Sequence, residues 1–159
     1  MMADYFCHGD KAFLRGMGVD PTRLPDRDEW VESLLLDHEK PDDQKDRLYL
    51  LWLIDGEPIG HSSINKIVPG AEAYIHLHMW KAELRRAGLG TELVRKSVAY
   101  CFERFYLQKL VCEPFADNVA PNRVLEKLGF RFIRRYTTTP GATAFEQDVN
   151  RYELLKANS

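Results

Sequence analysis

The spacing of apolar residues along the 159-residue chain changes between a helical and a strand-like period. Apolar residues recur at steps of three and four in three segments, residues 26–36, 91–105 and 121–128. Alternating or densely apolar runs, which predict strands, occupy residues 47–54, 58–68, 73–80, 109–113, 130–136 and 144–155. The predicted order is one helix, three strands, a helix, a strand, a helix and two strands.

Two features organise the strand-rich middle of the chain. Asp55-Gly56 is a turn signal that joins the first two runs into an antiparallel hairpin. In the third run, residues 74, 76 and 78 share one face of the strand, and the apolar residues 75, 77 and 79 share the other. His76 and His78 therefore face away from the expected core.

The first 45 residues carry a weaker pattern. The segment 26–36 begins with acidic residues, as the first turn of a helix often does. Its apolar side chains form a stripe that we expect to be buried, consisting of Trp30, Val31, Leu34 and Leu35. No clear strand precedes the hairpin, so residues 1–13 either contain one or form helices.

Composition narrows the class of protein. With 22 basic and 24 acidic residues and a net charge of -2, the chain offers no electrostatic argument for nucleic acid as a partner. Three cysteines are an odd number, and Cys101 and Cys112 lie in apolar runs, which favours a reducing compartment. No apolar stretch is long enough to span a membrane, and the N-terminus does not resemble a signal peptide. We expect a soluble, cytoplasmic protein with one domain, residues 1–159.

A glycine-containing loop connects the third strand to the helix that opens at Thr91. Its sequence is Arg85-Arg86-Ala87-Gly88-Leu89-Gly90. Glycines let the backbone approach an oxygen-rich ligand, and the first N–H groups of a helix have no partner inside the helix. The helix dipole adds about half a positive charge at that end, and the two arginines add formal charge. The loop is therefore a candidate anion site.

Two sequence blocks resemble the GNAT superfamily of acetyltransferases. The R-x-x-G-x-G pattern between a strand and a helix is similar to the acetyl-CoA pyrophosphate motif of that family. About 22 residues later, 112–118 followed by 122–130 looks like its N-x(n)-L-E-K-L-G-F region. The resemblance covers at least 47–155. It implies an α+β (α/β) fold: a mixed, twisted sheet of six to seven strands, flanked by helices and splayed between the fourth and fifth strands.

The resemblance also implies which residues bind acetyl-CoA, the expected co-substrate. Arg85 and the backbone N–H groups of 86–91 would hold the pyrophosphate, and the strand end at Met79 and Trp80 would pair with the pantetheine arm. Asn118 would hydrogen-bond that arm, whereas Asn122 is either a further contact or part of a helical turn. The implied cofactor-binding set is Met79, Trp80, Arg85, Arg86, Ala87, Gly88, Leu89, Gly90, Thr91, Asn118 and Asn122.

Acetyl transfer to an amine needs a base, and His76 with Glu113 is the candidate pair. The resemblance to siderophore-related and aminoglycoside acetyltransferases, which carry an acid-proline pair at the place of Glu113-Pro114, selects His76 over His78. Many members supply a proton from a tyrosine where this chain has Leu125, so a cysteine or tyrosine elsewhere, water, or departure of the free thiolate must substitute. His76, His78 and a third ligand could hold a metal, but the chemistry needs none, and we expect no metal.

Three functions remain open. The first is acetylation of a primary amine on a small molecule such as an aminoglycoside, by direct transfer in a ternary complex. The second is acetylation of protein N-terminal α-amines, as in the ribosomal-protein-alanine branch that the chain also resembles. The third is an acyl-CoA-binding regulatory module without catalysis. An acidic acceptor mouth would favour a polycationic drug. The chain is a monomer or a homodimer, and the apolar strand 145–155 could pair across a dimer.

Overall fold

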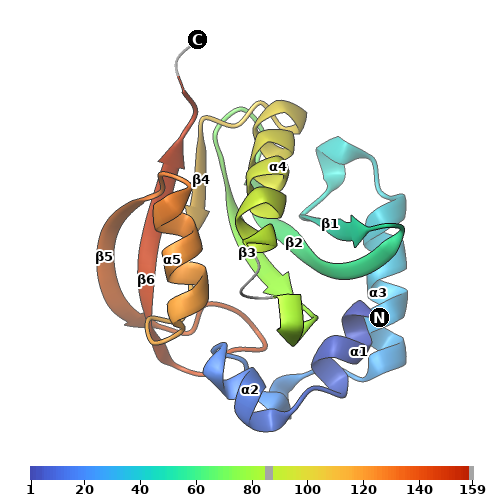
Figure 1. The fold of residues 1–159 in the computed structure, drawn as a ribbon. Coiled ribbons are helices and arrows are strands. Elements are labelled where there is room, and N and C mark those ends of the chain that lie inside the picture. Colours follow the sequence, from blue (N-terminus) through green and yellow to red (C-terminus); the bar gives the residue numbers. More distant parts are fainter. Residues whose placement is uncertain (85–87, 158–159) are drawn as a thin grey trace.

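The computed structural model describes residues 1–84 and 88–157. The helices are α1 (Met2–Cys7), α2 (Lys11–Gly16), α3 (Arg27–Glu39), α4 (Leu89–Arg104) and α5 (Val119–Lys127), with 3-10 turns at Pro21–Arg23, Asp42–Gln44 and Ala82–Leu84. The strands are β1 (Arg47–Ile54), β2 (Glu57–Val68), β3 (Glu72–Met79), β4 (Lys109–Cys112), β5 (Arg131–Thr138) and β6 (Gln147–Leu155). Figure 1 shows that β1 to β6 form one sheet. The predicted order from residue 27 onward is confirmed.

The sheet is mixed, and its strand order is β1-β2-β3-β4-β6-β5. Neighbouring strands are antiparallel except β3 and β4, which run parallel. That parallel ladder begins at Glu72 beside Lys109 and ends at Tyr74 beside Val111. Beyond Tyr74 the two strands separate, which is the predicted splay. The diverging strands are the third and fourth of this chain, because residues 1–46 form helices, turns and an isolated bridge at Val19 instead of a first strand.

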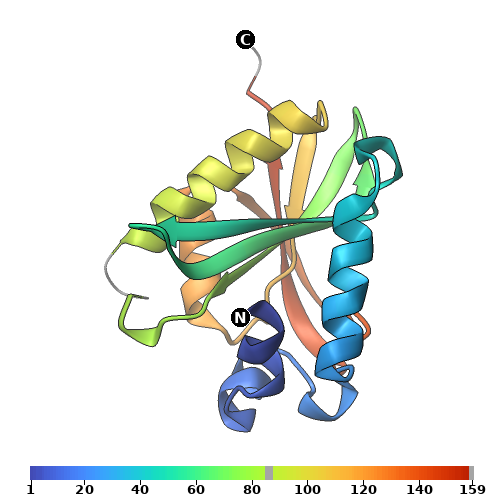
Figure 2. The same ribbon diagram turned by 90° about the vertical axis from the view of Figure 1, so that its right-hand side faces the viewer.

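The helices cover the sheet in two layers (Figure 2). The stripe of α4, which includes Val94, Val98 and Cys101, packs with Trp52 and Ile75 of the sheet in one buried cluster. Leu125 of α5 belongs to the same cluster, so α4 and α5 share a face. Helices α1 and α3 contact each other and lie on the opposite face, which is the face that His76 and His78 occupy.

The N-terminal region corrects one prediction and settles an alternative. The alternative for residues 1–13 is settled in favour of helices, because α1 and α2 fill this segment. The predicted buried stripe of α3 is wrong at Leu35, whose side chain is 60% exposed. Asp37 is buried instead, because Lys40 and Arg47 both form ion pairs with its carboxylate, at 2.8 and 3.1 Å.

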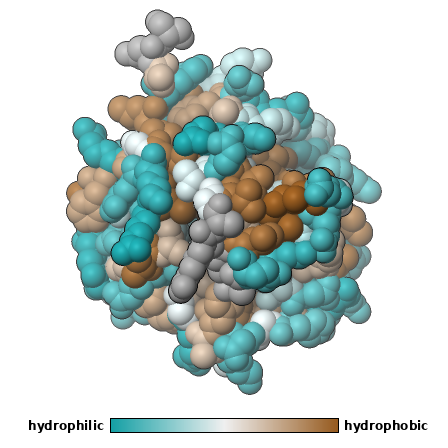
Figure 3. All heavy atoms as spheres, in the orientation of Figure 1, coloured by the Kyte–Doolittle hydropathy of each residue, from teal (hydrophilic) through white to brown (hydrophobic). Residues whose placement is uncertain are grey.

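The position of β6 excludes the proposed pairing of that strand across a dimer. Strand β6 lies between β4 and β5, so both of its edges are already hydrogen-bonded. The edges of the sheet are β1 and β5. Strand β1 exposes Leu51 and Leu53, and apolar surface gathers over the β1–β2 end on the face seen in Figure 3. The apolar composition of β6 therefore reflects burial of the strand within the sheet and not an edge that is open to a partner.

Candidate active site

A groove of about 590 Å³ lies on the sheet face opposite α4. Its floor is formed by β2 and β3, and α1, α3, the turn after β4 and the loop near Pro140 form its walls. The predicted residues His76, Glu113 and Asn118 all line this one groove. Its further aromatic and histidine lining consists of Phe6, Trp30, Tyr49, His61, Tyr74, His78 and Phe115.

His76 is oriented by its neighbour across the β2–β3 ladder. Its Nε2 lies 3.2 Å from Oδ1 of Asn65. Because an amide oxygen only accepts hydrogen bonds, Nε2 carries the proton and donates it to this bond. Within the described residues, Nδ1 of His76 has no hydrogen-bond partner and is left as the unprotonated nitrogen. Burial, and then the positive charge of Lys66, lowers the pKa of His76 to about 4, although Glu113 acts in the opposite direction. The imidazole is therefore neutral at physiological pH.

His61 and His78 form a stacked pair beside it. Their ring centroids are 4.8 Å apart, and Phe6 of α1 packs edge-on against His78 at 5.0 Å. The indole N–H of Trp80 donates to Nδ1 of His61 at 2.9 Å, which fixes the neutral tautomer of His61. Burial lowers the pKa of His61 to about 3 and that of His78 well below its usual value. Nδ1 of His78 is buried without a hydrogen-bond partner among the described residues.

Glu113 is held by two donors. The phenol of Tyr136 donates to its Oε1 at 2.5 Å, and Nη1 of Arg151 donates to the same oxygen at 3.0 Å. The same Nη1 also donates to the hydroxyl of Tyr74 at 3.0 Å. The Glu113 side chain is only 8% exposed, so this carboxylate is stabilised mainly by Arg151 rather than by water.

The mouth of the groove is not acidic. Five acidic residues were candidates for an acidic mouth. Glu113 lines the groove, whereas Asp42, Asp43, Asp46 and Asp117 do not. Among the described residues, the charged groups in the lining are Arg23, Glu29, Arg47, Lys66 and Glu113. Three cations therefore face two carboxylates, one of which is neutralised by Arg151. A polycationic acceptor gains no electrostatic advantage here.

The glycine loop is described from Gly88 onward, and the predicted residues Arg85, Arg86 and Ala87 lie outside the described part. Gly88 is the N-cap of α4 with φ +76°, a backbone conformation that favours glycine. Among the described residues, no side chain caps the helix at its first N–H groups, around Gly90 and Thr91. A β-carbon at Gly90 would have only the methyl of Met79 within 4 Å, at 3.8 Å, so packing alone does not require this glycine.

Met79 and Trp80 occupy the end of β3 differently. The backbone N–H of Trp80 donates to the carbonyl of Ile59 at 2.9 Å, toward β2. Successive residues of a strand direct their backbone groups to opposite edges, so Met79 directs its own toward the side where β4 has diverged. Only Met79 therefore has the backbone direction expected for pairing with a pantetheine arm, while the Trp80 side chain orients His61.

The two predicted asparagines and Leu125 follow β4. Asn118 is the N-cap of α5 and lines the groove half-buried. The amide of Asn122 donates to the carbonyls of Phe115 and Asn118 and accepts from Asn150, at 2.7 to 3.2 Å. These contacts favour a structural role for Asn122 over contact with a cofactor. Leu125 is fully buried in the core, and its side chain carries no group that could donate a proton.

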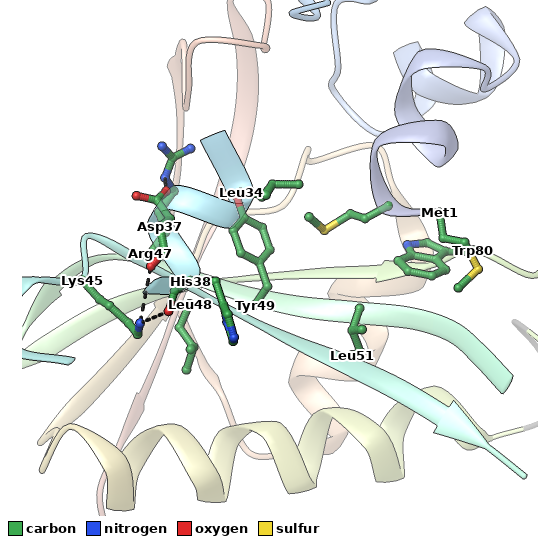
Figure 4. Close-up of a pocket in the computed structure, with 11 residues that line it drawn as sticks. Met1, Leu34, Asp37, His38, Lys45, Arg47, Leu48, Tyr49, Leu51 and Trp80 are labelled. Carbon is green, nitrogen blue, oxygen red and sulfur yellow. Dashed lines mark hydrogen bonds and ion pairs between the residues drawn. The ribbon is translucent and has the colours of Figure 1, made fainter. Parts of the chain in front are cut away.

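A second cavity of about 340 Å³ lies between α3, β1 and the start of α1 (Figure 4). Its apolar lining includes Leu34, Leu51 and Trp80, and Tyr49 borders both cavities. The charged side chains at its other end are engaged internally: Lys45 donates to the carbonyls of Asp37, His38 and Lys40, and Asp37 pairs with Arg47. We therefore place the chemistry in the larger groove.

Among the described residues, no group of three or more His, Cys, Asp or Glu side chains is arranged to hold a metal ion. Within the same residues, none of the helices combines the length and apolar character needed to cross a membrane.

Sequence reasoning missed Asn65, Lys66, Tyr136 and Arg151. The register of β2 against β3 places Ser63 opposite His76 and therefore brings Asn65 and Lys66, two and three residues further along β2, close to it. The alternation of side chains along β3 indicated that His76 faces a neighbouring strand. The sequence did not show the register of β2 against β3, and so did not show which residue of β2 is its partner. Tyr136 and Arg151 belong to β5 and β6, and only the sheet order brings them to Glu113.

Comparison with known proteins identifies related chains. A family model described as "Acetyltransferase (GNAT) domain" matches residues 2–131. The "Uncharacterized N-acetyltransferase YoaA" of Bacillus subtilis (strain 168) is 34% identical over 74 residues, 45% of this chain. That match spans only 40% of the length of the curated relative.

Several solved structures share the fold. RimL, a ribosomal L7/L12 alpha-N-protein acetyltransferase solved with coenzyme A, superposes with a TM-score of 0.76 at 20% identity, covering 97% of this chain and 86% of RimL. The microcin C7 self-immunity acetyltransferase MccE, solved with acetyl-CoA and AMP, has a TM-score of 0.76 at 16% identity, with coverages of 98% and 86%. The spermidine N-acetyltransferase of Vibrio cholerae, solved with CoA and spermine, has a TM-score of 0.74 at 18% identity, with coverages of 95% and 86%.

Proposed function

Because the chain belongs to the GNAT acetyltransferase domain family, we propose that it moves an acetyl group from acetyl-CoA to a primary amine of a small molecule by direct transfer in a ternary complex. The observation that carries this proposal is the position of the splay. Where β3 and β4 stop pairing, after Tyr74 and Val111, one sheet face carries α4 and the other carries the groove with His76. A thioester and an amine can therefore meet between the two strands.

The cofactor side of the proposal rests on the start of α4. The amide groups after Gly88 have no side-chain cap, and the dipole of a 16-residue helix favours an anion there. We assign pyrophosphate binding to the backbone of Gly88, Leu89, Gly90 and Thr91, and pantetheine pairing to Met79. Acetyl-CoA would supply the activated acetyl group, and the chain would orient it.

On the acceptor side, we assign the role of base to His76. Oδ1 of Asn65 accepts a hydrogen bond from the Nε2–H group, which leaves the Nδ1 lone pair to take a proton from the amine as the amine nitrogen attacks the carbonyl carbon and the C–S bond breaks. Because the imidazole is neutral above pH of about 4, its Nδ1 lone pair carries no proton at physiological pH. Glu113 already accepts from Tyr136 and Arg151, so we assign it a positioning role.

We assign no side chain to protonation of the departing thiolate. The position of the usual tyrosine is occupied by the buried Leu125, and burial raises the pKa of the nearby Cys112 thiol to about 12. A thiolate whose conjugate acid has a pKa of about 8.5 can leave without a proton donor.

Two rival functions differ in measurable ways. The proteins named above are a ribosomal-protein acetyltransferase, a microcin C7 self-immunity acetyltransferase and a spermidine acetyltransferase, so likeness to them does not select an acceptor. An N-terminal acetyltransferase would acetylate peptides in preference to small amines. An acyl-CoA-binding module would bind acetyl-CoA and release no free CoA with any amine. A panel of amines and short peptides, followed by thiol release, separates all three.

The cofactor site is tested by titration calorimetry with acetyl-CoA. The variant Gly90→Val places a side chain where the protein leaves space, so we expect it to fold normally and to bind acetyl-CoA at least tenfold more weakly. Gly16→Val is the matched control, because a β-carbon at Gly16 meets no heavy atom within 4 Å and so fits as easily as one at Gly90. Equal affinity in wild type and both variants would remove the loop from the proposal, and no binding by wild type would overturn the proposal itself.

A further inference from the structure

Lys66 occupies an unusual position at the edge of the groove. It lies where the register of β2 against β3 shifts, between Asn65 and Val68, and its backbone has φ +49°. A non-glycine residue in this conformation is uncommon and marks a local irregularity that redirects the side chain. The Lys66 ammonium lies 4.4 Å from the centroid of the Tyr74 ring, and both residues line the groove. The ring thus positions a cation at the groove wall.

The charge of Lys66 is not balanced by a neighbouring carboxylate. Of the described residues, none places a carboxylate within 4.0 Å of its ammonium, whereas the other cations of the groove are paired. Arg47 lies 3.1 Å from Asp37, and Arg23 lies 3.6 Å from Asp20. Besides Glu113, the lining contains one more carboxylate, Glu29, which is exposed in the first turn of α3. Lys66 is therefore a cation in the lining that is available to a ligand.

Lys66 is also coupled to the proposed base. The residue before it, Asn65, binds His76, and the positive charge of Lys66 is the second cause, after burial, of the low pKa of His76. Tyr74, over whose ring the Lys66 ammonium lies, and His76 share one face of β3 and are two residues apart. A ligand group that binds Lys66 would consequently lie near the atom that accepts the proton.

We propose that the acceptor carries an anionic group, a carboxylate or a phosphate, which Lys66 binds while the amine faces His76. This inference rests on the proposed acetyltransferase function and narrows its acceptor. An amine with a second positive charge would instead meet Lys66 with like charge. The aromatic lining of the groove, including Tyr49, Tyr74 and Phe115, fits an apolar segment between the two charged ends.

Binding of such an acceptor would also change the base. An anion at Lys66 offsets the positive charge that disfavours protonation of His76, so proton acceptance becomes easier once the correct acceptor is bound. A polycation would have the opposite effect. Selectivity would therefore act on turnover as well as on affinity.

The test is a thiol-release assay with matched acceptors. One series is ω-amino acids of increasing chain length, which vary the distance between amine and carboxylate; a second is the corresponding carboxamides; a third is aminoalkyl phosphates; spermidine is the polycation. We expect at least one anionic acceptor to exceed its neutral amide by on the order of tenfold in kcat/KM. The carboxylate and phosphate series distinguish the two anions.

Substitutions then connect this preference to the residue. Lys66→Gln should remove the preference, through kcat as well as KM; Lys66→Arg should keep it; and Lys66→Glu should shift it toward spermidine. Lys156→Gln, which changes an exposed lysine outside the groove, should leave it unchanged. Equal use of acids and amides by wild type, or a preference that survives in Lys66→Gln, would overturn the role of Lys66. Release of CoA with none of the acceptors, despite acetyl-CoA binding, would instead count against the proposed function.

Discussion

Tyr136 and Glu113 are joined by a hydrogen bond of 2.5 Å that links the turn after β4 to β5. Arg151 of β6 approaches the same carboxylate oxygen at 3.0 Å, so three segments converge on one atom. Glu113 is 38 residues from Arg151 in the sequence, and the bond therefore fixes a long-range relationship. A carboxylate with two such donors stabilises one wall of the groove rather than serving as a free base.

We expect Glu113→Gln to lower the free energy of unfolding by about 1–3 kcal/mol, because it leaves Arg151 without one of its two ionic partners. Tyr136→Phe removes a neutral donor and should cost about 1 kcal/mol. Urea denaturation measures both values. If Glu113→Gln keeps the stability of wild type but loses all turnover at neutral pH, Glu113 is the base and our assignment is wrong.

Stability should fall with acid because of the histidines in the groove. Burial lowers the pKa of His61 and His76 to about 3 and 4, and that of His78 is lowered as well. The unfolded chain, with ordinary pKa values near 6.5, binds more protons below that pH, so unfolding becomes more favourable as the pH falls from about 6.5 to 4. Each histidine contributes roughly 1.4 kcal/mol per pH unit inside this window.

The measurement is the free energy of unfolding between pH 4 and 8. His78→Phe keeps an aromatic ring in the stack and removes the buried, unpartnered Nδ1. We expect this variant to show a smaller slope, by about one proton, and to be more stable than wild type at pH 5. An unchanged slope would mean that His78 titrates alike in the folded and unfolded chains.

Asn65 should control the tautomer of His76. Replacing it with aspartate keeps an acceptor for Nε2 but adds a negative charge, which raises the pKa of His76. The acidic limb of the plot of kcat/KM against pH should therefore move to higher pH. Asn65→Leu removes the acceptor and should lower kcat on the order of tenfold. Nitrogen chemical shifts of the imidazole report the tautomer independently of activity. A tautomer that is the same in wild type and Asn65→Leu would contradict the positioning role.

Leu125→Tyr should not restore a proton donor. Leu125 is fully buried among core residues, so a phenol at this position has no free space and no route to the groove without displacing its neighbours. We expect a loss of about 1–3 kcal/mol of stability and no gain in turnover. Thermal unfolding and the thiol-release assay check the two expectations. A variant that is both stable and faster would show that this side chain can turn toward the cofactor.

The periodicity of the sequence predicted most of the fold, because burial imposes a period on each element. The stripe of α4 and the alternation of β3 were visible, since Val94 and Ile75 must face the core. Residues 1–13 were left open between a strand and helices, because α1 and α2 span only six residues each and are too short to show a helical period. Leu35 was misassigned for a different reason: ion pairs allow Asp37 to be buried in the last turns of α3, which apolar spacing does not anticipate.

The candidate site was only partly accessible to sequence reasoning. His76 and Glu113 were chosen from strand alternation and from family resemblance, and both do line one groove. What decides their chemistry is the pairing of each with a residue distant in sequence. Asn65 reaches His76 through the register of β2, and Arg151 reaches Glu113 because β6 inserts between β4 and β5. Neither relationship leaves a local pattern in the chain.

The short parallel ladder between β3 and β4 makes the sheet a joint between two antiparallel halves, one formed by β1 to β3 and the other by β4 to β6. Tyr74 is the last residue of β3 in that ladder, and its hydroxyl is bonded to Arg151 in the opposite half. A molecule that lies along the open part of the joint touches both halves at once. Its binding would couple their unfolding, so the two halves of the sheet should exchange amide hydrogens as separate units when empty and as one unit when filled.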